Sequence, residues 1–154
     1  VVEVGELPTI EADPMQMRQL LQNLIGNALK FQPPDNRPVV KVQARLFRRT
    51  VGGGTDTEIV EEMCALTVPD NGIGFDEKYL DKVFAVFQRL HGRNEYEGTG
   101  VGLAVCRRIT DRHGGVISAR SKAGEGATFI VQLPLRHVRQ AVAAETQNPE
   151  PVAA

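Results

Sequence analysis

The first clear feature along the chain is a helical repeat of apolar residues between positions 15 and 31. Methionine, leucine, isoleucine and alanine recur there every three or four residues, which is the spacing of one face of an α-helix. Asp13 and Pro14 suit a helix start, because an Asp side chain caps free N–H groups and proline loses nothing at the first helical position. Pro33 and Pro34 end the repeat. We therefore expect a first helix over 15–31.

Alternating apolar and polar residues predict strands on both sides of this helix. The predicted strands are a pair of short segments within residues 1–10, a long hairpin of residues 39–47 and 59–68, and a second hairpin of residues 116–119 and 127–133. The glycine-rich residues 51–57 fit the tip of the long hairpin better than a phosphate loop. A short helix is expected at 76–80. A further apolar helix runs to His113 and is stopped by Gly114 and Gly115.

Two stretches have no regular pattern. Residues 80–97 are largely polar and show no clean period, which inside a compact domain is typical of a functional lid. After Leu135 the Ala/Glu/Gln/Pro-rich residues cannot form a core. We expect one domain over 1–135 and a disordered tail or linker over 136–154.

The composition of the chain narrows its class and location. With 154 residues, 42% hydrophobic and 24% charged, it is the size of one soluble globular domain. A net charge of -1 gives no overall field for nucleic acid or an anionic membrane, and no apolar run approaches the roughly 20 residues that span a bilayer. Cys64 and Cys106 are far apart, so neither a zinc site nor a disulfide is expected. We expect a cytoplasmic domain without nucleic-acid or membrane contact, and, since the chain starts without Met, a fragment of a longer protein.

The first predicted helix carries an unusual polar stripe. Its polar residues cluster within about 60° of the helix surface, opposite the apolar face; they are Gln16, Asn23, Asn27 and Lys30. A plain solvent-facing surface is one reading, but such surfaces usually carry Glu, Lys and Arg, and Asn is a mediocre helix former. The alternative is a site that needs short amide oxygens and a cation. Gly26 beside them fits close approach of another group to the backbone.

Two glycine clusters lie downstream of this helix. Gly98-Thr99-Gly100-Val101-Gly102-Leu103 opens the later helix, where backbone N–H groups form an anion site. Asp70-Asn71-Gly72-Ile73-Gly74 reads either as a simple turn or as part of a site. An EF-hand calcium loop is excluded here, because Gly72 and Gly74 stand at positions where such a loop needs oxygen ligands. Neither cluster has Walker or Rossmann spacing.

Together these residues resemble the ATP-binding catalytic domain of sensor histidine kinases, within the GHKL ATPases that share the Bergerat fold. The resemblance covers about residues 1–135. The matching motifs, in order, are Asn23 to Phe31 (N box), Asp70 to Phe75 (G1 box), Val83 to Phe87 (F box) and Gly98 to Leu103 (G2 box). Residues 88–98 are most similar to phytochrome-related and PAS-linked kinases.

The resemblance implies an α+β fold, a two-layer sandwich in which a mixed, mostly antiparallel sheet packs on about three helices, with a mobile ATP lid. It implies ATP and Mg²⁺ as cofactors. Asp70 would accept a hydrogen bond from the adenine 6-amino group, and Asn27 would bind Mg²⁺. The other residues that it assigns to the nucleotide are Asn23, Lys30, Gly72, Gly74, Phe75, Arg89, Gly98, Thr99, Gly100, Val101, Gly102 and Leu103.

The resemblance assigns different roles to these residues. Gly72 and Gly74 let the backbone approach the base, and the amides of residues 98–102 wrap the phosphate chain. The catalytic residues would be Asn23 and Lys30 near the phosphates and Arg89, which reaches the γ-phosphate from the start of the lid.

Asn23 decides between two reactions. Hydrolytic relatives carry a Glu at this place, and an amide cannot act as a general base. Asn23 therefore favours transfer of the γ-phosphoryl group to a protein. The resemblance implies that the acceptor is a histidine on a separate dimerisation domain, with a response regulator receiver domain further along the relay.

The chain itself has no residue suited to that role. In the family the acceptor histidine precedes Asp or Glu, whereas His91 precedes Gly92, His113 precedes Gly114, and His137 precedes Val138. His113 is expected to interact with the last carbonyls of its helix instead. We expect ATP binding without autophosphorylation. A nucleotide-sensing module or pseudokinase and a GHKL-type ATPase remain the alternatives. Pro69 departs from a central strand and is expected to mark its end.

Overall fold

The structure, a computed structural model, describes residues 1–52, 59–85 and 102–136 of the chain. Its elements are β1 (Val2–Val4), α1 (Pro14–Lys30), β2 (Val40–Val51), β3 (Ile59–Pro69), the 3-10 helix η1 (Glu77–Tyr79), α2 (Leu80–Val83), α3 (Gly102–Arg112), β4 (Val116–Ser121) and β5 (Ala127–Pro134). The strands form one sheet in the order β1-β2-β3-β5-β4. The β1–β2 pair is parallel and the others are antiparallel.

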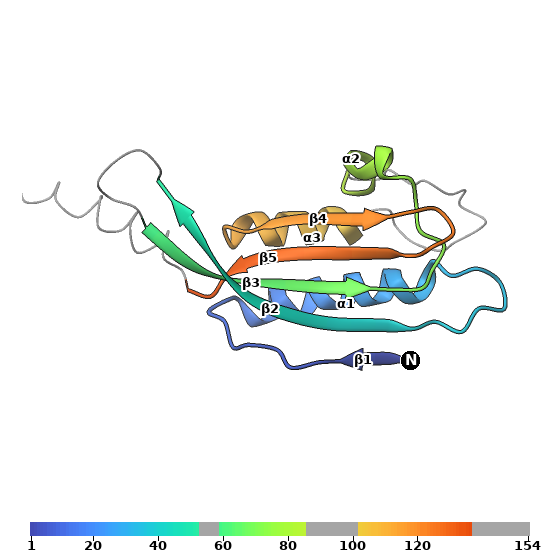
Figure 1. Cartoon of the computed structure of the whole chain (residues 1–154), viewed down its shortest axis with the longest axis horizontal. Helices are drawn as coiled ribbons and strands as arrows, with labels where there is room; N and C mark the ends of the chain where they lie inside the picture. The colour runs from blue at the N-terminus through green and yellow to red at the C-terminus, as the bar shows by residue number, and fades with distance from the viewer. Residues whose placement is uncertain (53–58, 86–101, 137–154) are drawn as a thin grey trace, which may run out of the picture.

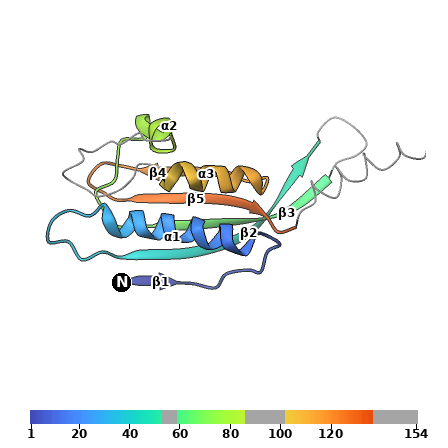
Figure 2. The same ribbon diagram turned by 180° about the vertical axis from the view of Figure 1, so that it is seen from behind.

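The molecule has two layers. Helices α1 and α3 lie side by side on one face of the sheet, as the two opposite views in Figures 1 and 2 show. The mixed, mostly antiparallel sheet and its helices confirm the α+β class expected from the sequence.

Helix α1 begins where the sequence predicts, because Asp13 caps it. Oδ1 of Asp13 accepts hydrogen bonds from the backbone N–H groups of Met15 (2.9 Å) and Gln16 (3.2 Å), and Pro14 takes the first helical position. The helix ends at Lys30, one residue before the predicted limit. The apolar face of the helix, with Leu20, Leu24 and Ala28 buried, packs against the sheet.

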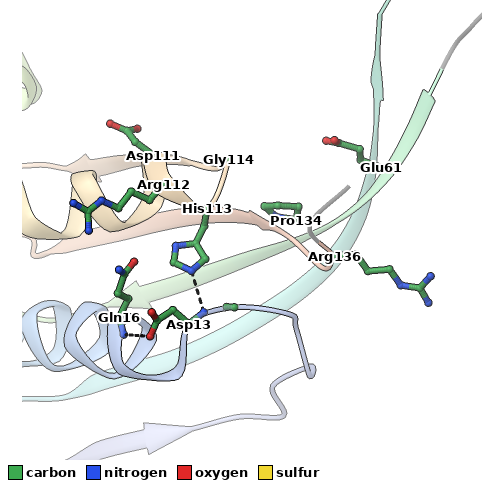
Figure 3. A pocket seen from close by; sticks show the side chains of 10 residues that line it. Asp13, Gln16, Glu61, Asp111, Arg112, His113, Gly114, Pro134 and Arg136 are labelled. Atoms are coloured by element: carbon green, nitrogen blue, oxygen red, sulfur yellow. Dashed lines mark hydrogen bonds between the residues drawn. The ribbon is translucent and has the colours of Figure 1, made fainter. Parts of the chain in front are cut away.

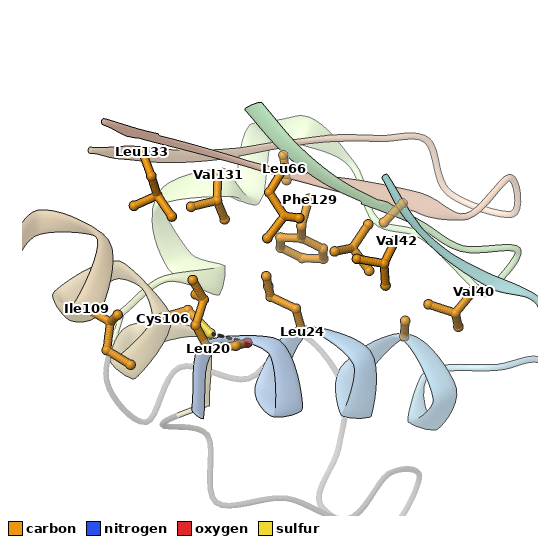
Figure 4. Close-up of a cluster of buried hydrophobic side chains, with 14 of the residues drawn as sticks. Leu20, Leu24, Val40, Val42, Leu66, Cys106, Ile109, Phe129, Val131 and Leu133 are labelled. Carbon is orange, nitrogen blue, oxygen red and sulfur yellow. Dashed lines mark hydrogen bonds between the residues drawn. The ribbon is translucent and has the colours of Figure 1, made fainter. Parts of the chain in front are cut away.

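The core fills the space between the two helices and the sheet (Figure 4). Leu20 and Leu24 of α1 are almost fully buried, and Cys106 of α3 lies beside them. Each such leucine stabilises the fold by about 1.5–3 kcal/mol relative to an exposed one. The sheet side chains that complete the cluster include Val40, Val42, Leu66, Phe129, Val131 and Leu133.

Cys106 is the buried thiol that the apolar pattern predicts. Its side chain is fully buried, and burial raises its pKa to about 12. A thiol with this pKa stays protonated at neutral pH and is a poor nucleophile. Cys106 therefore serves packing.

His113 joins the end of α3 to the start of α1. Its Nδ1 lies 2.8 Å from the carbonyl oxygen of Ile109, which confirms the predicted contact with the last turn of its helix. Its Nε2 accepts a hydrogen bond from the backbone N–H of Asp13 at 3.2 Å. A neutral ring with the proton on Nδ1 satisfies both contacts. Gly114 follows with φ of 71°, the left-handed conformation that ends helices.

The N-terminal expectation was partly wrong. Only Val2–Val4 forms a strand, whereas the predicted second segment around Leu7 and Ile10 forms none. Pairing stops after the Gly5 N–H donates to the Val42 carbonyl. Pro8 has no N–H for a ladder, and the chain instead crosses to the far end of the sheet, where Glu11 donates to the Leu135 carbonyl at 2.8 Å.

The β2–β3 hairpin is longer than the alternation predicts. β2 continues to Val51, and β3 pairs with β5 only from Met63 to Pro69, so the hairpin extends past the other strands (Figure 1). An ion pair between Arg49 and Glu61 at 2.6 Å crosses it. Pro69 is the last residue of β3, as expected. The predicted lid and tail largely lie outside the described residues.

Candidate nucleotide-binding site

Asp70 follows the end of β3 and is held there by the neighbouring strand β5. Its N–H donates to the Ala127 carbonyl at 2.9 Å. Its Oδ1 accepts from the N–H groups of Gly72 (2.8 Å) and Ala127 (3.2 Å). Within the described residues both side-chain hydrogen bonds end on Oδ1, so Oδ2 is available to a donor on a ligand.

The surroundings of Asp70 alter its acidity. Desolvation by burial raises its pKa above the ordinary 3.8, and the two backbone hydrogen bonds from Gly72 and Ala127 oppose part of that rise. Half-buried carboxylates with fixed partners are typical of ligand sites. The arrangement offers a preoriented acceptor at the surface of the sheet.

The glycines around Asp70 let three segments of backbone meet. A Cβ on Gly72 would lie closer than 3.0 Å to the Phe31 carbonyl, and one on Gly74 equally close to the Lys122 carbonyl. Gly126 would meet the carbonyl of Asp70 itself, and its φ is 86°. The close approach seen here is to protein backbone; approach of Gly72 and Gly74 to a base stays a prediction.

Asn71, between these glycines, has a structural task. Its side-chain oxygen accepts from the Val39 N–H at 2.8 Å, and its amide donates to the Arg37 carbonyl at 3.0 Å. These bonds fix the loop before β2. The sequence alone shows only an Asn-Gly turn signal at this place.

The polar stripe of α1 faces the start of α3. Asn23 donates from Nδ2 to the Gly102 carbonyl at 3.3 Å, and a Cβ on Gly102 would stand 3.9 Å from the amides of both Asn23 and Asn27. The structure thus brings together residues that are 79 positions apart. This part of the stripe is no plain solvent-facing surface.

Other predicted site residues occupy less direct positions. The exposed Lys30 places Nζ 5.7 Å from the Phe31 ring centroid. Phe75 packs on the core with its ring 6.3 Å from that of Phe129. Leu103 is partly buried against the same core. Nothing described comes within 4 Å of a Cβ on Gly26, so close packing there is not found in the described part of the chain.

Part of the predicted site lies outside the described residues: Arg89, Gly98, Thr99, Gly100 and Val101. Gly102 is the first described residue of the glycine cluster and the first of α3. The anion site expected at this helix start therefore stays a prediction.

Two residues at the site, Ser121 and Gly126, were not predicted from the sequence. Ser121 accepts from the Phe75 N–H at 2.8 Å and donates to the Gly126 carbonyl at 2.9 Å. Gly126 in turn packs against Asp70. The Gly124-Glu125-Gly126 turn marks a special backbone in the sequence, but its contact with residue 70 is not encoded locally.

A separate pocket of about 580 Å³ lies where α1 begins and α3 ends (Figure 3). Asp13, Glu61, Arg112, His113 and Arg136 are among the residues that line it. Asn27 and Gly102 occupy the opposite ends of the same helices. Although Gln16 of the polar stripe lines it, this pocket is separate from the site built by Asp70, Asn23 and Asn27.

Within residues 1–52, 59–85 and 102–136, no group of three or more His, Cys, Asp and Glu is placed to hold a metal ion. No helix in the described part of the chain has the length and apolarity to cross a bilayer.

Comparison with protein families gives a match over most of the chain. The model of the family described as "Histidine kinase-, DNA gyrase B-, and HSP90-like ATPase" matches residues 12–137. Among curated proteins, the phytochrome-like protein Cph1 of Synechocystis sp. is 40% identical over 87% of this chain and 16% of its own length. Cyanobacterial phytochrome A of Nostoc sp. is 43% identical over 84% of this chain and 15% of its own. The chain thus spans under a fifth of these relatives.

Solved structures agree in fold. The mycobacterial sensor histidine kinase MprB superposes with a TM-score of 0.68 at 22% identity, covering 88% of this chain and 83% of that one. Full-length ShkA in complex with AMPPNP gives 0.62 at 28% identity, covering 86% and 25%. A likeness at 22% identity speaks for the fold alone.

Proposed function

Because this chain belongs to the family of histidine kinase-, DNA gyrase B- and HSP90-like ATPases, we propose that it binds Mg²⁺·ATP and supplies the γ-phosphoryl group to a histidine on a separate dimerisation domain. It is an ATP-binding catalytic domain of the histidine kinase type, like the corresponding part of Cph1. The roles of single residues, the metal and the partners, given below, are what we propose beyond the family.

The carboxylate of Asp70 is the observation that carries the proposal. Two backbone N–H groups hold its Oδ1, so the plane of the carboxylate is fixed before a ligand arrives. The remaining oxygen, Oδ2, accepts a hydrogen bond from the 6-amino group of adenine. A base with a carbonyl at that position would place two acceptors face to face, which selects ATP over GTP.

The metal is assigned to the amide oxygen of Asn27. Mg²⁺ prefers hard oxygen ligands and keeps several waters, so one amide oxygen plus phosphate oxygens meets its needs without an acidic cluster. When bound, Mg²⁺ neutralises charge on the phosphates during transfer.

The phosphates are assigned to residues on both sides of the α1–α3 contact. The proposed set is Asn23, Lys30, Arg89 and residues 98–103. The bond from Asn23 to the Gly102 carbonyl supports this placement, since it sets the α1 amides against the start of α3. Phosphoryl transfer needs mainly positioning and charge neutralisation, which these residues supply.

Transfer is favoured over hydrolysis by the same asparagine. An amide cannot take a proton from water, so Asn23 does not replace a general base. His113 is buried and both of its ring nitrogens are engaged, which leaves it unsuited as acceptor. In this proposal the acceptor histidine belongs to a separate dimerisation domain, and a response regulator receiver domain would take the group from it.

The test mixes this chain with the histidine-bearing dimerisation domain of its parent protein and γ-labelled ATP. We expect Mg²⁺-dependent label on the partner histidine and none on the chain alone. Binding of ATP without any phosphohistidine would favour a nucleotide-sensing module instead. Sustained phosphate release by the chain alone would favour an ATPase.

The metal assignment has its own test. We expect Asn27→Asp to change the Mg²⁺ concentration required for nucleotide binding, because a carboxylate adds charge to the ligand set. Gln22→Glu, on the exposed side of the same helix, adds the same charge as a control. An equal response in both variants would contradict the assignment.

A further inference from the structure

Ser121, the last residue of β4, holds the Asp70 loop through its hydroxyl group. Ser121 Oγ accepts the Phe75 N–H at 2.8 Å and donates its own proton to the Gly126 carbonyl at 2.9 Å. A hydroxyl has one proton to donate, and here it is used within the turn. Ser121 thus ties one end of the loop to one end of the turn.

Ser121 bonds to the segment that contacts Asp70, which consists of Gly126 and Ala127. Gly126 lies against the Asp70 carbonyl so closely that no Cβ fits between them. The next residue, Ala127, exchanges two hydrogen bonds with Asp70: its N–H donates to Oδ1, and its carbonyl accepts from the Asp70 N–H. The path from hydroxyl to carboxylate therefore passes through only two residues.

Two more bonds connect the same partners. The Gly124 N–H donates to the Ile73 carbonyl at 2.6 Å, and the Ser121 N–H donates to Glu77 Oε1 at 3.1 Å. The loop from Asp70 to Glu77 is therefore fastened to the turn along its length. These bonds preserve the general packing when the hydroxyl is removed, so its loss acts locally.

We propose that Ser121 is a positioning residue that orients the Asp70 carboxylate and thereby sets the preference of the site for adenine over other purines. The inference rests on the proposed function, since it takes Asp70 as the acceptor of the adenine amino group. Without the hydroxyl, the Phe75 N–H loses its partner and the Gly126 carbonyl keeps only the longer bond from Lys122 N–H at 3.5 Å. Gly126 and Ala127 then move relative to Asp70.

The effect on binding is selective because the phosphates and the base are held by different parts of the site. Misorientation of Asp70 weakens the contact to the 6-amino group and leaves the phosphate contacts of α1 and α3 in place. Inosine triphosphate carries a carbonyl where ATP carries that amino group. Its binding keeps the phosphate and ribose contacts but replaces the Asp70 hydrogen bond with a repulsion between two acceptors.

The test measures the affinities of Ser121→Ala for ATP and for inosine triphosphate by calorimetry. We expect ATP affinity to fall about tenfold, which is the worth of one good hydrogen bond, with no fall for inosine triphosphate, because its carbonyl gains nothing from an oriented Asp70. Ser121→Thr keeps the hydroxyl and is expected to restore the ratio. Ser118→Ala, an exposed position on the same strand, is expected to leave both affinities unchanged.

Equal losses for both nucleotides, or an unchanged ratio, would overturn the positioning role. Hydrogen exchange on the unaltered chain gives an independent measurement if Ser121→Ala does not fold. We expect protected N–H groups at Phe75 and Ala127; rapid exchange at both would overturn the proposal. If Asp70→Asn also retained ATP binding, the proposed function itself would fail, whereas loss of binding there confines the failure to Ser121.

Discussion

The N–H of Ala127 donates to Oδ1 of Asp70 across 3.2 Å, although 57 positions separate them in the chain. The bond places a carboxylate from the end of β3 against the start of β5. Its consequence is that the acceptor geometry depends on a turn remote from every motif that the sequence displays.

The acidity of Asp70 is a direct consequence of this setting. Because its pKa is raised in the folded state, ionisation of this carboxyl opposes folding; that unfavourable contribution is absent below 3.8 and complete above the folded-state pKa. We expect carbon-detected NMR of the ligand-free chain to give a midpoint above 3.8. ATP should lower the midpoint, since an amino donor favours the ionised form. A ligand-free midpoint at or below 3.8 would contradict the description.

Glycines 124 and 126 form a matched pair within one turn. Both have positive φ, 82° and 86°, but a Cβ on Gly124 meets nothing within 4 Å while one on Gly126 meets Asp70. We expect Gly124→Ala to cost about 1 kcal/mol from backbone strain alone. Gly126→Ala should cost clearly more in denaturant unfolding, because backbone must move. Equal costs would show that the close approach is absent in solution.

Asn23 makes a contact that only an amide satisfies. Its Nδ2 donates to the Gly102 carbonyl, and in Asn23→Asp a carboxylate would face that carbonyl with no proton to give. We expect a loss of about 1–3 kcal/mol in the free energy of unfolding together with weaker ATP binding from charge repulsion. Gln22→Glu controls for added charge. Unchanged stability in Asn23→Asp would show that the contact between Asn23 and Gly102 does not stabilise the fold.

His113 offers a test of the opposite kind. Replacing it with Phe leaves the Asp13 N–H without its imidazole acceptor, so thermal unfolding should report a loss of about 1–3 kcal/mol. ATP affinity should stay unchanged, because the residue lies at the far ends of α1 and α3. A fall in affinity without a fall in stability would give His113 a role in the site.

The sequence was informative where physical signals are local. The Asp13-Pro14 start and apolar repeat of α1 predict a helix that the structure confirms within one residue. The polar stripe with Asn23 and Asn27 predicts a site face; the structure shows that Asn23 contacts Gly102, and the binding of a nucleotide there stays a prediction. Helical geometry alone places residues four apart on one side.

Long-range partners could not be read in the same way. The apolar positions around Leu7 and Ile10 predict a strand. No strand forms there, because Pro8 has no N–H to donate and Glu11 bonds instead to the distant Leu135 carbonyl. Ser121 lies outside the predicted strand of residues 116–119, and its role depends on Phe75, 46 positions away. Contacts of this kind follow from sheet order, which short patterns do not specify.

Asp70 is proposed to select the adenine base, and calorimetry of Asp70→Asn with ATP measures that selection. Asn keeps an oxygen for the Gly72 and Ala127 N–H groups but presents an amide donor to the adenine amino group. We predict an affinity loss of about 100-fold or more, with the fold intact by circular dichroism. Asp111→Asn, remote on α3, should bind ATP as the unaltered chain does. Unchanged ATP affinity in Asp70→Asn would contradict the account.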